Sequence, residues 1–205
     1  MEVPFLDDYS IYNSARGFLQ TYHPSLVLPI PIENIIEIKL GLNILPIKNL
    51  ESGCHIDGSL GKDFKTILID EYEFEHLIQR ARFTLAHEVG HFTLHKTVFE
   101  KSGSFVDEEE FLAFQNRLGD REYKRLEIQA YRFAEEILFP KSILASIVEE
   151  TIKKLGGLDA LVVTDFEKIL SVISEKFDVS DKAAFNKVRR DFPSLFETIE
   201  ANVPF

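Results

Sequence analysis

The segment RFTLAHEVGHFTLH, residues 82–95, contains two histidines four positions apart, with a glutamate directly after the first. Residues four apart on an α-helix lie about 40° apart around the axis and about 6 Å apart along it. His87 and His91 can therefore direct an imidazole nitrogen at the same ion. Glu88 lies about 100° from His87, so it flanks the ion and does not ligate it. This arrangement of two nitrogen ligands and a carboxylate that takes a proton from bound water is typical of a zinc peptidase.

A catalytic zinc site takes three protein ligands, so the chain should supply a third. Residues 120–139 are predicted to form a helix whose apolar residues occupy one continuous arc when they are laid out at about 100° each. Apart from Asp120, the predicted N-cap, Glu127 is the only charged residue inside that arc. A carboxylate that faces a core must be paired, hydrogen-bonded or coordinated. We therefore predict Glu127 as the third ligand. The alternatives are a buried ion pair with an arginine such as Arg82 and, for the histidines, an exposed helix face without a metal.

Two further residues are candidates for contacts around the metal. His95 continues the histidine stripe but lies about 12 Å along the axis from His87, too far to share the ion, so a supporting position is expected. Tyr131 lies one turn beyond Glu127 and is a candidate for stabilising the oxyanion. Zinc is the expected ion, and the sequence does not separate it from Mn²⁺ or Fe²⁺.

The pattern of the chain predicts several helices and about three strands, which is an α+β composition. A boundary at 140–141 would separate a domain at 1–140 from a helical appendage at 141–205. The acidic run at 107–110 favours the start of a short helix, and the segment 96–119 could be a lid. Strands are expected at Leu42–Ile47, Cys54–Leu60 and Lys65–Asp70. Helices are expected at 9–22, 33–40, 75–95, 120–139 (with Asp120 as N-cap) and 142–155, after the capping box Thr164–Glu167, and after Ser180.

Composition narrows the classes of function. The 205 residues carry a net charge of −11, most of it within residues 1–140. In the tail, Lys187, Arg189 and Arg190 are opposed by nearby aspartates, so direct DNA binding is disfavoured. The acidic first residues are not a secretory signal, and no stretch is long and apolar enough for a membrane span. A single cysteine fits a reducing compartment, and a cytoplasmic location is expected.

Two motifs together resemble those of the ImmA/IrrE metallopeptidase family. They are Arg82-Phe-Thr-Leu-Ala-His-Glu-Val-Gly-His91 and Glu127-Ile-Gln-Ala-Tyr-Arg-Phe-Ala134, the latter followed by Ile137-Leu-Phe-Pro140. The upstream segments PIPIENIIEIKLGLNI and KTILIDEY look like the family's helix and strands, so the resemblance covers about residues 15–140. Residues 169–190 resemble the helix-turn-helix-like appendage of some members.

The resemblance implies a zincin-like fold, with a small sheet packed on the helix that carries the histidines. It also implies a zinc-dependent endopeptidase that cleaves a helix-turn-helix transcriptional repressor to relieve repression. Carried over by position, His87, His91 and Glu127 match the metal ligands, and Glu88 matches the catalytic base. The substrate is expected to lie extended along an edge strand, for which Cys54–Leu60 is the candidate.

Two other functions stay open. One is a regulatory module in which the metal is structural and the protein binds and sequesters a repressor. The other is a deformylase-like metallohydrolase in which Cys54 is the third ligand, a hypothesis that leaves Glu127 unexplained.

Overall fold

The computed structural model describes residues 2–54, 56–61, 63–102 and 108–201. The chain divides into two compact units, Met1–Leu138 and Phe139–Phe205. The boundary expected at 140–141 lies two residues from this division, and the domain assignment itself stays a prediction. Among the described helices, none has the length and apolar character that crossing a membrane requires.

In its described residues the first unit combines helices with one small sheet, which confirms the α+β class. Its sheet has three strands in the order β1-β3-β2, with β1 parallel and β2 antiparallel to β3. Its elements are α1 (Asp8–Tyr22), α2 (Ile32–Asn34), the π-helical turn η1 (Ile35–Lys39), β1 (Asn43–Ile47), α3 (Leu50–Cys54), β2 (Gly58–Leu60), β3 (Thr66–Asp70), α4 (Glu71–His76), α5 (Ile78–Leu94), α6 (Lys96–Ser102), α7 (Glu108–Leu118) and α8 (Asp120–Leu138).

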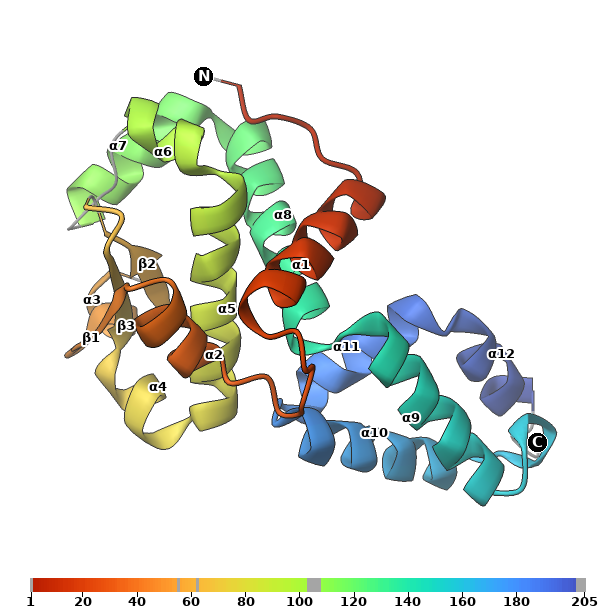
Figure 1. Ribbon diagram of the computed structural model, residues 1–205. Helices are drawn as coiled ribbons and strands as arrows, with labels where there is room; N and C mark the ends of the chain where they lie inside the picture. The colour runs from red at the N-terminus through yellow and green to blue at the C-terminus, as the bar shows by residue number, and fades with distance from the viewer. Residues whose placement is uncertain (1, 55, 62, 103–107, 202–205) are drawn as a thin grey trace. The chain divides into compact units, whose positions relative to one another are not determined.

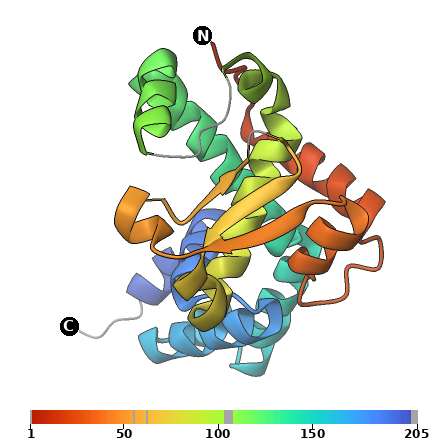
Figure 2. The same ribbon diagram turned by 90° about the vertical axis from the view of Figure 1, so that its left-hand side faces the viewer.

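The helix α5 is the centre of this unit. The sheet lies on one side of α5, and α8 and α1 lie on the other (Figure 1). The turned view shows the sheet in front of α5 (Figure 2). One side of α5 is therefore held against strands and the other against α8, which is why its buried residues are spread around the helix. They are Ala81, Arg82, Thr84, Leu85, Ala86, Glu88, Val89, Gly90 and His91.

The predicted helix 75–95 is two helices, and the prediction of one continuous segment is wrong. Leu77 leaves the helical conformation, with φ −121° and ψ 55°, between α4 and α5. The break allows Glu73 on α4 to accept a hydrogen bond of 2.5 Å from the Thr84 hydroxyl on α5. In an unbroken helix these two residues would lie about 16 Å apart along the axis. The carboxylate of Asp70 at the end of β3 accepts from the Glu73 amide and so caps α4.

The strand expected at Cys54–Leu60 is shorter than predicted. Cys54 ends the helix α3, residue 55 lies outside the described residues, and only Gly58–Leu60 pairs with β3. Asp120 is the first residue of α8 and not its N-cap, because Gly119 precedes it with a positive φ of 80°. The short helix expected from the acidic run 107–110 is α7, which begins at Glu108; residue 107 lies outside the described residues.

The first residues of the chain are bound to α8 by main-chain groups. The amide of Val3 donates to Glu122 at 2.7 Å, and the Val3 carbonyl accepts from Arg125 at 2.9 Å. The carbonyl of Pro4 accepts from the side-chain amide of Gln129 at 2.9 Å. Val3 is fully buried in an apolar cluster with Val98, Phe99, Phe114, Leu118 and Leu126. This cluster joins α6 and α7 to α8 beside the histidines.

The second unit is helical, with α9 (Lys141–Lys154), the 3-10 turn η2 (Leu158–Ala160), α10 (Val163–Phe177), α11 (Asp181–Asp191) and α12 (Pro193–Ala201). The capping box at Thr164–Glu167 is misplaced, because it is Asp165 that accepts the Val162 amide at 3.2 Å. Lys187 is fully buried and pairs with Asp191 at 2.9 Å, so it presents no charge to phosphate. The helix-turn-helix-like character of α10 and α11 stays a prediction.

Candidate metal centre

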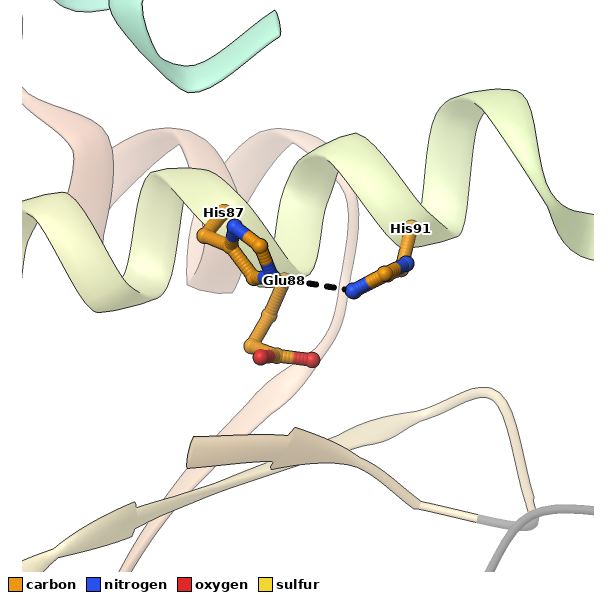
Figure 3. Close-up of side chains that lie close together, drawn as sticks. All are labelled: His87, Glu88 and His91. Carbon is orange, nitrogen blue, oxygen red and sulfur yellow. Dashed lines mark hydrogen bonds between the residues drawn. The ribbon is translucent and has the colours of Figure 1, made fainter. Parts of the chain in front are cut away.

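The structure brings together the three residues that the sequence predicted as ligands. The Nε2 atoms of His87 and His91 lie 2.9 Å apart on adjacent turns of α5 (Figure 3). The carboxylate of Glu127, which comes from α8, lies 3.1 Å from Nε2 of His87 and 3.5 Å from Nε2 of His91. His91 is buried, whereas His87 and Glu127 are partly exposed, with 18% and 35% of their side chains accessible. The three groups therefore form a cluster that is open on one side.

A close contact between α5 and α8 positions Glu127. Gly90, which stands between the two histidines, packs against the backbone of Ala130. A Cβ at position 90 would lie 2.9 Å from the Ala130 carbonyl oxygen, so only glycine permits this approach. Ala130 follows Glu127 by three residues and lies on the same side of α8. The missing side chain at position 90 thus brings the α8 carboxylate within reach of the α5 imidazoles.

Glu88 is buried beside the histidines on the side of α5 that faces the sheet. Its carboxylate is directed toward the strands (Figure 3) and accepts a hydrogen bond from the backbone amide of Leu60 in β2. The side chain packs next to Gly58, where a Cβ would lie 3.6 Å from Cγ of Glu88 and 2.6 Å from Thr84. Burial raises the pKa of Glu88 above its ordinary value, although the neighbouring His91 and His87 lower it.

His87 and Glu127 stabilise each other's charged forms. Burial raises the pKa of Glu127, but the charge of His91 and the hydrogen bonds from both imidazoles outweigh burial and hold that pKa well below its usual range. Burial likewise lowers the pKa of His87, and the hydrogen bond and charge of Glu127 reverse that effect and raise it. The site therefore offers one carboxylate and two imidazoles whose polar atoms face one another.

These donor atoms fit a divalent cation. Two donor atoms bound to a tetrahedral zinc ion at about 2.0–2.1 Å lie about 3.3 Å apart. The separations of 2.9, 3.1 and 3.5 Å among His87, His91 and Glu127 lie around that value. Donor atoms of His87, Glu88 and His91 also lie within 4.8 Å of one another. We favour Glu127 as the third ligand because it is closer to both imidazoles, whereas the Glu88 carboxylate is bonded to the Leu60 amide.

His95 contacts His91, one of the predicted ligands, on the side of that ring away from His87 and Glu127. Its Nδ1 lies 3.1 Å from Nδ1 of His91, and its Nε2 lies 2.8 Å from Oε1 of Gln129. Burial, and then the charge of His91, lowers the pKa of His95 to about 3, so the ring is neutral. Phe99 supports the same ligand, with its ring centre 5.5 Å from that of His91.

Of the two tyrosines on α8, the one beside Glu127 is Tyr123, which was not among the residues predicted from the sequence. Its hydroxyl is hydrogen-bonded to Glu127 and Gln115, and burial, followed by the charge of Glu127, raises its pKa. Tyr131 lies against Phe83 with ring centres 5.0 Å apart, and its role with the oxyanion stays a prediction. The i, i+4 spacing of Tyr123 and Glu127 is a signal that would have identified the first of these residues.

Two residues were considered as alternatives in the sequence: Arg82 as an ion-pair partner of Glu127, and Cys54 as a metal ligand. The guanidinium of Arg82 donates to the Ile30 carbonyl at 2.8 Å and pairs with Glu33 at 3.3 Å. The side chain of Cys54 lies outside the part of the chain that the structure describes, so the deformylase-like hypothesis stays a prediction.

The fold and the site together define a class, that of α+β proteins with a zincin-like domain in which a short sheet packs on the helix bearing the HEVGH motif. A comparison with protein families matches residues 54–188 to the Peptidase M78 family, described as the IrrE N-terminal-like domain. The chain belongs to this peptidase family, whose members are typically metal-dependent. A comparison with curated proteins finds no match.

Proposed function

We propose that the protein is a zinc-dependent endopeptidase that cleaves a helix-turn-helix transcriptional repressor and so relieves repression. The observation that carries this proposal is the convergence of two imidazoles from α5 and a carboxylate from α8, with Glu88 buried beside them. Membership of a peptidase family supports it. The repressor as substrate follows from the resemblance of the two sequence motifs to the ImmA/IrrE family.

In this proposal His87, His91 and Glu127 hold the cation, and the side of the cluster that stays accessible is left for the substrate. A bound zinc ion supplies a Lewis acid that polarises the scissile carbonyl and lowers the pKa of water to about 7. The negative charge of Glu127 and the burial of His91 favour a bound cation over solvation of the separate ligands.

Glu88 is the general base. It follows His87 on the helix, so its carboxylate flanks the ion site and does not compete with the ligands. Burial raises its pKa toward the range in which a carboxylate can both accept and return a proton. Glu88 takes a proton from the attacking water and gives it to the leaving amine, while the Leu60 amide holds the carboxylate in place.

The strand β2 is the proposed docking edge for an extended substrate. It is an outer strand of the sheet, and among the described residues its ladder partner is β3 alone. Its Leu60 amide contacts Glu88, which places this edge beside the base. A peptide that adds to a sheet edge is held by main-chain hydrogen bonds, which place few demands on its sequence. The net charge of −11 would favour a basic partner such as a DNA-binding repressor.

The test is incubation of the zinc-loaded protein with helix-turn-helix regulators of the same genome, including any that is encoded beside its gene. We expect cleavage by the wild type, none after chelation, and a loss of about 10²–10⁴-fold in rate for Glu88→Gln. Glu75→Gln, an exposed change on α4, is the matched control and should cleave normally. Cleavage by Glu88→Gln at the wild-type rate would rule out this mechanism. An intact regulator in a stable complex with metal-loaded wild type would instead indicate a sequestering module.

A further inference from the structure

A line of hydrogen bonds, buried at the histidines and partly buried at its far end, runs from the metal-facing ligand His91 to the backbone of Pro4. Its links are His91 Nδ1 to His95 Nδ1 at 3.1 Å, His95 Nε2 to Gln129 Oε1 at 2.8 Å, and Gln129 Nε2 to the Pro4 carbonyl at 2.9 Å. All three residues are at most 4% exposed. Within such a site water does not replace a missing partner, so each group must match its neighbour as donor or acceptor.

The carbonyl of Pro4, at the far end of this line, determines which atom is the donor in each hydrogen bond of Gln129. A carbonyl oxygen can only accept, so the side-chain NH₂ of Gln129 must face Pro4 and its oxygen must face His95. That oxygen also only accepts, so His95 carries its proton on Nε2. Nδ1 of His95 lies 3.1 Å from Nδ1 of His91, and two protonated nitrogens cannot share such a contact, so one of the two must be an acceptor without a proton. A His91 ring that binds a cation through Nε2 carries its proton on Nδ1, which makes Nδ1 of His91 the donor and Nδ1 of His95 the acceptor.

We propose that Gln129 and His95 are positioning residues that fix His91 as the tautomer protonated on Nδ1, so that its Nε2 lone pair faces the metal. The donor and acceptor roles are set in turn, from the carbonyl of Pro4 through Gln129 on α8 to His95 and then to His91 on α5. The inference rests on the metal centre of the proposed function but not on its substrate. Partners of this kind fix the ring orientation of a ligand, and their loss typically lowers metal affinity about 10–100-fold.

Three residues on one face of α8 hold the main chain of Val3 and Pro4 in place. Glu122, Arg125 and Gln129 are spaced three and four residues apart, so they form one row on the helix. All three bond to the main chain of Val3 and Pro4, and these bonds hold the Pro4 carbonyl at the end of the line. The acceptor is thus fixed independently of the histidines.

The direct test is the tautomer of His95, read from long-range ¹H–¹⁵N correlation spectra of the zinc-loaded full-length protein. We expect a protonated Nε2 and an unprotonated Nδ1 on His95, and a protonated Nδ1 on His91. A His95 ring protonated on Nδ1 would overturn the proposal. A protein with the expected tautomers but without peptidase activity would contradict the proposed function and leave this inference intact.

Three substitutions of Gln129 separate the effect of its role as hydrogen-bond acceptor from the effect of its packing. Gln129→Glu still presents an acceptor to His95, Gln129→Met presents no polar group, and Gln129→Lys presents a donor that reverses the line. Zinc affinity, measured by competition with a chelator, should stay near that of the wild type for the first and fall about 10–100-fold for the other two. If the lysine variant fails to fold, the glutamate and methionine pair gives the same comparison. Equal affinities in Gln129→Glu and Gln129→Met would overturn the proposal.

Discussion

Gly90 on α5 and Ala130 on α8 are in direct backbone contact at the point where the two helices present the candidate metal site. A Cβ at position 90 would lie 2.9 Å from the carbonyl oxygen and 3.0 Å from the Cα of Ala130. The helices cannot separate without carrying Glu127 away from His87 and His91. The packing of the two helices and the assembly of the candidate metal site are therefore two results of the same contact.

Gly90→Ala should therefore reduce both stability and zinc affinity. An added methyl group in a packed interface costs about 1–3 kcal/mol in the free energy of unfolding, measured by urea denaturation. Gly17→Ala on α1 is the matched control, because a Cβ there meets nothing within 4 Å. That change should stabilise the protein by about 0.5–1 kcal/mol through helix propensity. Equal stabilities for the two variants would show that the contact is not constrained.

Removing the charge of Glu127 should remove most of the stabilisation that zinc provides. At a free zinc concentration about 1,000 times the dissociation constant, binding to the native state adds about 4 kcal/mol, which a chelator should abolish. Glu127→Gln keeps the size of the side chain but lacks the charge, so its melting temperature should respond little to zinc. Glu149→Gln, an exposed change on α9, should respond as the wild type does. A full zinc response in Glu127→Gln would exclude that residue as a ligand.

Of the two tyrosines of α8, Tyr123 should affect zinc affinity and Tyr131 should affect kcat. Tyr123→Phe keeps the ring in the apolar cluster but removes the hydroxyl bonded to Glu127, so zinc affinity should fall, by up to about 10-fold. Tyr131→Phe should leave zinc affinity unchanged and lower kcat if Tyr131 stabilises the oxyanion. Chelator competition and steady-state kinetics measure the two quantities. An unchanged affinity in Tyr123→Phe would show that its hydroxyl does not hold the ligand.

Glu73 should make stability depend on pH. Burial raises its pKa from 4.5 to about 7, so the folded protein favours the protonated form. The contribution of this group to stability is largest below about pH 4.5 and is lost as the pH rises through 7. Glu73→Gln cannot ionise, so its stability relative to wild type should improve between pH 5 and pH 8, on the order of 1 kcal/mol after allowance for its ion pair with Arg80.

Urea denaturation at the two pH values measures this difference. Glu75→Gln, on the same helix but exposed, should show no such change. A difference between Glu73→Gln and wild type that is the same at both pH values would contradict the raised pKa.

Helical periodicity predicted the part of the site that depends on a single element. The spacing of His87 and His91 on one helix, and the inward position of Glu127 on another, both follow from about 100° per residue. The structure places these three side chains together. Periodicity could not show that the helix 75–95 breaks at Leu77, because the break depends on Glu73 bonding to Thr84, a contact between elements.

The supporting residues were missed for a related reason. Gln129 lies beside the apolar arc of α8 and appears in the sequence as an ordinary polar residue, yet it is 3% exposed and bonded to His95, 34 positions away. Gly90 stands inside the metal motif, where its role in packing against Ala130 has no local signature. Residues that come into contact only when two helices pack together produce no periodic pattern in the sequence.

The acceptor of the Gln129 amide is a main-chain oxygen, and this limits what mutagenesis can detect. Replacing the Pro4 side chain leaves that oxygen on the chain, so a substitution scan would record position 4 as silent wherever the segment keeps its path along α8. Replacing the amide that follows Pro4 with an ester would weaken this acceptor, and displacing Val3 from its burial beside Phe99 and Phe114 would move it. Both changes would affect His95 and His91, whereas alanine at position 4 would not.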